Sequence, residues 1–99
     1  MTDKTLPNGY VALRGRLICR TPKEAETVRA HLPAHEALSR AEPGCISFDV
    51  TATDDPLVWH VAEQFSSEEA FAAHQHRVAE SEWGLATAGI TREYRVTRG

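Results

Sequence analysis

The sequence predicts a small α+β domain with the element order β-α-β-β-α-β, in which an antiparallel sheet carries two helices on one face. Three observations support this prediction. Four segments alternate apolar with polar residues, which is the period of a strand. Two segments between them have helical spacing and begin with capping residues. The chain of 99 residues has room for a single domain with a small core.

The first strand is expected at residues 10–19. Val11, Leu13 and Leu17 lie an even number of residues apart, so they share one face of this strand. Gly15 interrupts the alternation. A glycine inside a strand indicates a bulge or the close approach of another group.

The first helix is expected to begin at Thr21. A threonine N-cap, a proline at the first helical position and a glutamate three residues after the cap form a capping box. Pro33 removes one backbone hydrogen bond and collides with the preceding turn, so we expect a kink near Leu32 within a helix that continues. The helix should end by Pro43 and Gly44, because the residue before a proline avoids helical dihedrals and glycine can adopt a positive φ.

The second strand is expected at residues 45–52. Its apolar residues Ile46, Phe48 and Val50 should share one face. Residues 53–56, Thr-Asp-Asp-Pro, are typical of a turn, so this strand should form a hairpin with the next one.

The third strand, residues 58–65, has apolar side chains at alternate positions on both of its faces. Trp59, Val61 and Phe65 belong to one face and Val58 to the other. A strand with two apolar faces is typical of the centre of a sheet.

The second helix is expected to begin at the capping sequence 66–69. Phe71, His74 and Val78 have the spacing of its inner side. A last strand is expected at residues 90–97.

One face of such a sheet has no helix to cover it. We expect Trp59 and Phe48 to be exposed in an isolated chain, and an exposed apolar face of that size marks an interface. A homodimer with its sheets face to face would bury them.

Composition and charge exclude several classes of function. The chain is 41% apolar and 25% charged, as in ordinary globular proteins. A net charge of -3 with acids and bases interspersed offers no basic stripe for nucleic acid. No apolar run is long enough for a membrane span, and residues 1–8 lack the regions of a signal peptide. We therefore expect a cytoplasmic protein with a flexible N-terminus at residues 1–8 and one domain at 9–99.

Motifs for metals, nucleotides and cofactors are absent from the sequence. It contains no phosphate-binding loop, no H-E-x-x-H pair and no dinucleotide fingerprint. Cys19 and Cys45 are too far apart to form a C-x-x-C site, so both are expected to be free thiols. The sequence predicts neither a cofactor nor a metal.

The histidines offer one weak metal motif and one candidate for acid-base chemistry. His31 and His35 have the i,i+4 spacing of a shared ion, but Pro33 is expected to disturb that register, which favours solvated side chains. His74 and His76 lie two residues apart on a helix and cannot enter the same pocket. His74 faces the sheet, where it is either a hydrogen-bonded core residue or an ionisable group in a pocket.

The aromatic residues form a second candidate set. Trp83 follows a polar run and precedes a glycine, which suits the rim of a cavity. With Tyr94 and Arg92 it could hold a planar phenolic ligand and its oxyanion, although structural roles are equally open. The other members of the set are Phe48, Trp59 and Phe65.

Two motifs together resemble the antibiotic biosynthesis monooxygenase family. The segment Glu63–His74 reads E-x-F-x-S-x-x-A-F-x-x-H, and the segment Glu42–Phe48 reads E-P-G-C-I-S-F. The resemblance implies a ferredoxin-like fold that pairs into a dimeric α/β barrel. It also implies a pocket between helices and sheet beside His74.

What is known of that family implies oxygenation of a quinol or polyphenol by O2, without metal or flavin. In that case His74 is the candidate base, and Arg92 or Trp83 stabilises the substrate anion. The remaining substrate contacts are expected from Phe48, Trp59, Phe65 and Tyr94.

Alternatives stay open at this point. The fold also suits a non-catalytic dimeric protein that binds ligands or responds to stress, or an isomerase or other ring-modifying enzyme in which His74 moves a proton. Glu63 is either an exposed strand residue or a partner for Arg92.

Overall fold

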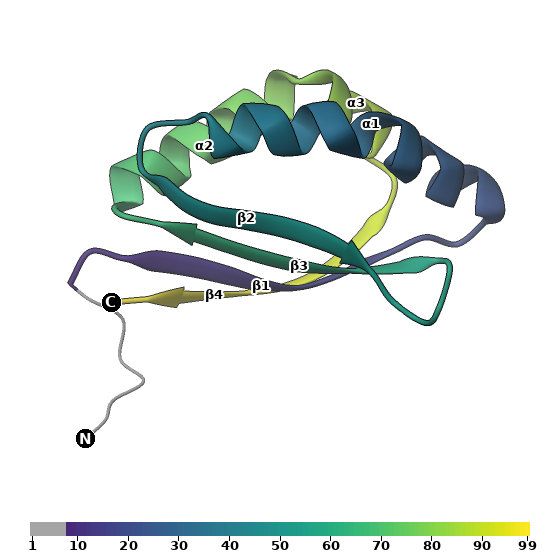
Figure 1. The fold of residues 1–99 in the computed structure, drawn as a ribbon, viewed down its shortest axis with the longest axis horizontal. Helices are drawn as coiled ribbons and strands as arrows, with labels where there is room; N and C mark the ends of the chain where they lie inside the picture. The colour runs from purple at the N-terminus through teal and green to yellow at the C-terminus, as the bar shows by residue number, and fades with distance from the viewer. Residues whose placement is uncertain (1–7) are drawn as a thin grey trace.

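The structure, a computed structural model, describes residues 8–99 and has the predicted order of elements (Figure 1). The elements are β1 (Val11–Ile18), α1 (Pro22–Arg40), β2 (Cys45–Ala52), β3 (Val58–Phe65), α2 (Glu68–Glu80), α3 (Glu82–Ala86) and β4 (Thr91–Arg98). The α+β, ferredoxin-like arrangement is confirmed, with the short helix α3 as an addition. The predicted flexible N-terminus lies outside the described residues, except for its last residue.

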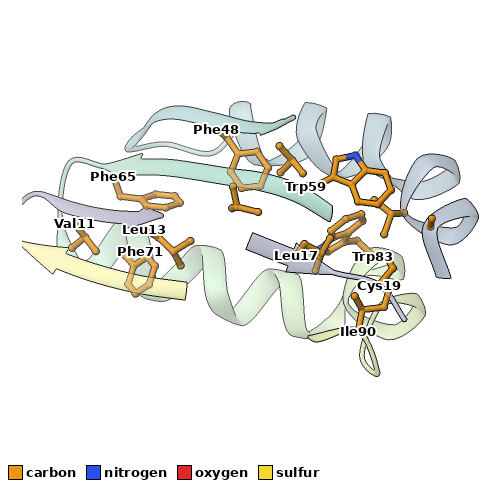
Figure 2. Packing of buried hydrophobic residues seen from close by; sticks show 14 residues of the cluster. Val11, Leu13, Leu17, Cys19, Phe48, Trp59, Phe65, Phe71, Trp83 and Ile90 are labelled. Atoms are coloured by element: carbon orange, nitrogen blue, oxygen red, sulfur yellow. The ribbon is translucent and has the colours of Figure 1, made fainter. Parts of the chain in front are cut away.

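The sheet is antiparallel with the strand order β2-β3-β1-β4, so β3 is an inner strand as expected. The helices α1, α2 and α3 of the described residues lie on one face of it (Figure 1). Side chains from β1, β2 and β3 meet those of the helices in the layer between them (Figure 2).

The expected exposure of Trp59 and Phe48 is wrong. Trp59 is 5% exposed and Phe48 is 1% exposed, because their faces of β3 and β2 are the ones that the helices cover. The opposite face of the sheet carries mainly polar side chains, among them Arg14, Arg16 and His60. The outer face is therefore not the apolar surface on which the expectation of a homodimer was based.

A bulge in β2 changes the face of Ile46. Cys45 is opposite Phe65 and Ser47 is opposite Gln64, so Ile46 is the extra residue on the β2 side. Ile46 is 46% exposed instead of sharing the buried face of Phe48.

Helix α1 passes through Pro33 and continues to Arg40. Its Thr21 hydroxyl accepts the Glu24 N–H at 3.1 Å, which confirms the predicted cap. The continued helix confirms that Pro33 does not end it, while the kink stays a prediction. The expected disturbance between His31 and His35 is wrong, because helical register is kept across the proline.

Gly15 confirms the close approach expected within β1. A Cβ atom there would lie 1.9 Å from the Glu93 carbonyl oxygen of the neighbouring strand β4. Only glycine can therefore occupy this position without movement of the backbone.

Among residues 8–99, none of the helices has the length and apolar character needed to cross a membrane.

Candidate functional site

A cavity of about 390 Å³ lies between the helices and the sheet. Five of the seven predicted site residues line it: His74, Trp83, Arg92, Phe48 and Tyr94. The other two, Trp59 and Phe65, are buried in the core and are not part of its wall. The structure thus brings together residues from α2, α3, β2 and β4.

Helix α2 holds His74 against the sheet. Its cap forms where the Ser67 hydroxyl accepts the Ala70 N–H at 3.0 Å. His74 is 2% exposed. Its ring lies 4.9 Å from that of Phe65 and 5.5 Å from that of Phe48, measured between centroids. The side chain is therefore enclosed by aromatic rings on the sheet side.

The turn between α1 and β2 brings Glu42 to the same histidine. Gly44 has φ +85°, and a Cβ there would lie 2.5 Å from the Cβ of Ala70, so the turn packs tightly on α2. Oε1 of Glu42 lies 2.9 Å from Nδ1 of His74. The tight turn is thus what positions this carboxylate.

Arg77 fixes the other oxygen of that carboxylate. Its Nε–H donates to Oε2 of Glu42, and its Nη2 donates to the Ser39 hydroxyl at 2.9 Å. A carboxylate paired with arginine acts as an acceptor, so Nδ1 of His74 carries the hydrogen and Nε2 keeps its lone pair. In this tautomer Nε2 carries no hydrogen and can act as a base.

Burial lowers the pKa of His74 from the usual value for histidine, and the hydrogen bond and charge of Glu42 oppose this effect. The imidazole is therefore neutral at neutral pH. A neutral ring with an available lone pair can accept a proton from a bound ligand.

Glu63 is the second carboxyl group beside this ring. It is 7% exposed, and its Oε1 lies 3.6 Å from Nε2 of His74. That oxygen has no hydrogen-bond partner among the described residues. Burial, followed by the charge of Glu42, raises the pKa of Glu63 to about 7. Neither expectation for Glu63, exposure or pairing with Arg92, is correct.

Arg92 is held by the loop that precedes β4. Its Nη1 donates to the carbonyl oxygens of Thr87 at 2.6 Å and Ile90 at 2.9 Å, and its Nη2 donates to the Thr87 hydroxyl at 2.7 Å. The guanidinium group still lines the cavity. It supplies a fixed positive charge there, with few donors left for a ligand.

Tyr94, next on the same face of β4, lines the cavity as well. Burial raises the pKa of its phenol to about 12, although 37% of the residue is exposed. The phenol is therefore protonated at neutral pH and can donate a hydrogen bond.

A sharp corner between α2 and α3 directs Trp83 back onto α1. The Ser81 hydroxyl donates to the Val78 carbonyl at 2.7 Å and accepts the Gly84 N–H at 3.0 Å. A Cβ on Gly84 would lie 2.0 Å from the Val78 oxygen, so this corner requires glycine. Trp83 is 6% exposed and forms a buried wall rather than the predicted rim.

A comparison with models of protein families finds a match over most of the residues that form this site. A model of the family described as antibiotic biosynthesis monooxygenase matches residues 19–83. The chain belongs to this family. The matched segment of the antibiotic biosynthesis monooxygenase family contains Glu42, Glu63 and His74 but ends before Arg92 and Tyr94.

Solved structures confirm the fold of this family. Rv0793 from Mycobacterium tuberculosis is 26% identical, with 91% of this chain and 94% of that chain covered at a TM-score of 0.70. PA3566 from Pseudomonas aeruginosa is 22% identical, with 91% of each chain covered and a TM-score of 0.66. MupZ from Pseudomonas fluorescens is 16% identical, with 97% and 73% covered and a TM-score of 0.72. None of the curated proteins matches the chain.

Sequence reasoning missed three residues of this monooxygenase-family site: His35, Glu42 and Arg77. His35 was expected to be solvated, but it is 5% exposed and its ring stacks on Trp83 at 4.4 Å and 4°. Burial lowers the pKa of His35 to about 3. The signal was available, since His35 lies seven residues after Val28 on the buried stripe of α1.

The other two could be found only in part. Arg77 follows His74 by three residues, which places both on one side of α2. Glu42 belongs to another element, and nothing in the sequence pairs it with His74. Among residues 8–99, no group of three or more His, Cys, Asp or Glu side chains is placed to share a metal ion.

Proposed function

We propose that this protein is a cofactor-independent monooxygenase that oxidises a quinol or another polyphenol with O2. The observation that supports this proposal is the neutral His74 at the cavity, with its Nδ1 held by Glu42 and its Nε2 free. A positioned base of this kind can generate the electron-rich phenolate that reacts with O2.

The proposed reaction needs one proton acceptor and one environment for an anion. Nε2 of His74 accepts the phenolic proton, and the phenolate then gives an electron to O2. Recombination of the two radicals forms a carbon–oxygen bond. Overall, one oxygen atom enters the substrate and the other leaves as water.

Two features of the wall favour an aromatic anion as ligand. Phe48 and Trp83 supply flat apolar surface for a planar ring. Arg92 supplies a positive charge at the same cavity. The volume of about 390 Å³ lies within the usual range for small-molecule sites.

The test is incorporation of labelled oxygen. Purified protein and a panel of dihydroxyaromatic compounds are incubated under ¹⁸O₂, and the products are analysed by mass spectrometry. Incorporation of one labelled atom per product molecule supports the proposal. Binding without incorporation favours the non-catalytic ligand-binding alternative, and a product of unchanged oxygen content favours the isomerase alternative.

We further propose that the chain works as a homodimer, as the family resemblance implies. Within residues 8–99, no helix lies over the outer face of the sheet (Figure 1). Ala62, at its centre on β3, pairs with Arg14 and Asp49 on the two neighbouring strands. The interface would therefore be held by small and charged side chains rather than by a broad apolar patch.

A further inference from the structure

Glu63 is a carboxyl group in an apolar part of the sheet. Across the strands its neighbours are Leu13 on β1 and Phe48 on β2, and along β3 the same face carries Val61 and Phe65. Charge on a carboxylate is strongly disfavoured where water is excluded in this way. The position is thus built for a neutral acid.

The cations of the site are directed elsewhere. Arg77 binds Glu42, and Arg92 binds Thr87. Neither forms a hydrogen bond or an ion pair with Glu63 in the part of the chain that the structure describes. With only a neutral ring between two carboxyl groups, ionising both would leave a buried negative charge uncompensated.

The remaining titratable groups around Glu63 do not change this balance. His35 lines the cavity from α1, and its low pKa of about 3 keeps it uncharged. Tyr94 lines it from β4 and stays protonated, with a pKa of about 12. Glu42 adds a negative charge, which further raises the pKa of Glu63.

We propose that Glu63 is the proton donor of this site and delivers its proton to the oxygen atom that leaves the peroxide intermediate as water. The proposal rests on the proposed monooxygenase activity. Its geometric basis is the unpartnered Oε1, which lies in the cavity wall 3.6 Å from Nε2 of His74.

The second half of the reaction removes one proton from carbon and delivers one proton to oxygen, and the proposal assigns these two steps to two groups. After the first half, the phenolic proton has passed through His74 to the peroxide, and one substrate carbon carries both the OOH group and a hydrogen atom. His74 removes the C–H proton, and that electron pair forms the new carbonyl. The O–O bond breaks, its electrons leave with the outer oxygen, and the Glu63 proton converts the hydroxide into water.

His74 and Glu63 then return to their starting protonation states by a proton transfer between them. His74 holds a proton on Nε2 and Glu63 is ionised, with 3.6 Å between the two atoms. Transfer of this proton from nitrogen to oxygen restores neutral His74 and protonated Glu63. No further acid, base or reductant is needed.

The first arm of the test measures protonation without any substrate. Infrared difference spectra of the wild type and Glu63→Gln in D2O should show a protonated-carboxyl band at pH 6 that the variant lacks. The band should decrease around pH 7. Glu69→Gln changes an exposed glutamate on α2 and should keep the band. A wild-type spectrum without the band at pH 6 overturns the proposal.

The second arm measures turnover of a phenol that the wild type oxidises. Glu63→Gln keeps a neutral polar group but has no proton to give, so product formation should fall about 100-fold or more. Substrate binding should be retained, and with a dihydroxyaromatic substrate the peroxide adduct should instead release H2O2 and leave the two-electron oxidised quinone. Unchanged product formation overturns the proposal, and circular dichroism confirms that the variant is folded.

The two failures can be told apart. If no phenol is oxidised by the wild type, the monooxygenase proposal fails and the donor role of Glu63 fails with it, whatever the infrared result. If phenols are oxidised and Glu63→Gln is fully active, only the donor assignment is overturned.

Discussion

Oε1 of Glu42 and Nδ1 of His74 lie 2.9 Å apart although 32 residues separate them in the sequence. Glu42 is held in turn by Arg77, so a turn and a helix fix one imidazole between them. Such a carboxylate orients the ring and stabilises its protonated form when a proton is accepted. This contact is the reason to treat His74 as a base rather than as a core residue.

Glu42→Gln should impair the base. The charge of Glu42 raises the pKa of His74 against the effect of burial, so its removal should lower that pKa further. The rise of the oxidation rate with pH should therefore shift to lower pH, and the maximal rate should fall by about 100-fold. Histidine NMR titration and O2 uptake measure both effects. Glu69→Gln is the control, and an unshifted His74 titration would refute the role of Glu42.

His35→Phe should make the protein less sensitive to acid. The pKa of His35 is about 3 in the fold, below its usual value, so the unfolded chain binds this proton first as pH falls. Stability from neutral His35 is full above pH 6.5 and is lost as pH falls toward 3. As pH falls from 7 to 5, the difference in unfolding free energy between His35→Phe and the wild type should change by roughly 2 kcal/mol in favour of the variant.

The raised pKa of Glu63 changes the stability of the fold with pH in the opposite direction to the lowered pKa of His35. The wild type must therefore be compared with His35→Phe. Its pKa is raised to about 7, so the fold binds this proton more tightly, and that stability is lost as pH rises through 7. The wild-type curve alone mixes both groups. Denaturant unfolding of wild type and His35→Phe at each pH isolates His35, and a constant difference would contradict the assignment.

Pro33→Ala should be neutral or stabilising. The residue is exposed within α1, and alanine restores the hydrogen bond that proline cannot donate. Part of this gain is offset because the unfolded chain becomes more flexible. Thermal and denaturant unfolding measure the effect. A loss of several kcal/mol would instead show that the packing of α1 requires a proline-induced kink.

The homodimer proposal is tested by sedimentation at micromolar concentration. The wild type should have twice the chain mass of 11.0 kDa. Ala62→Arg places a long cation at the centre of the outer sheet face and should yield monomers, whereas Ala73→Arg on the exposed side of α2 should not. A folded wild-type monomer, or equal masses for the two variants, would contradict a sheet-to-sheet dimer.

The order of the elements could be predicted because each has local signals of its own. The cap at Thr21 and the glycine turn at Gly44 are confirmed by the structure. Which face of β3 the helices cover could not be read from alternation, since both faces carry apolar residues. The bulge at Ile46 was equally hidden, because an inserted residue leaves no mark in the period.

The residues of the site could be predicted only where their signal lies within a single helix or strand. His74 and Trp83 were found because the patterns around them are local. The role of Glu42 could not be predicted, because it depends on the contact between the α1–β2 turn and helix α2. The burial of Glu63 depended on which face of β3 is covered.

The most direct test of the account compares O2 uptake by the wild type, His74→Ala and His76→Ala on one phenolic substrate. His76 lies on the same helix but is exposed, so His76→Ala should keep the wild-type rate. The wild-type rate should rise with pH below 6.5, because burial lowers the pKa of His74. His74→Ala should remain folded and lose two to four orders of magnitude. An unchanged rate in His74→Ala would contradict the central claim that His74 is the base.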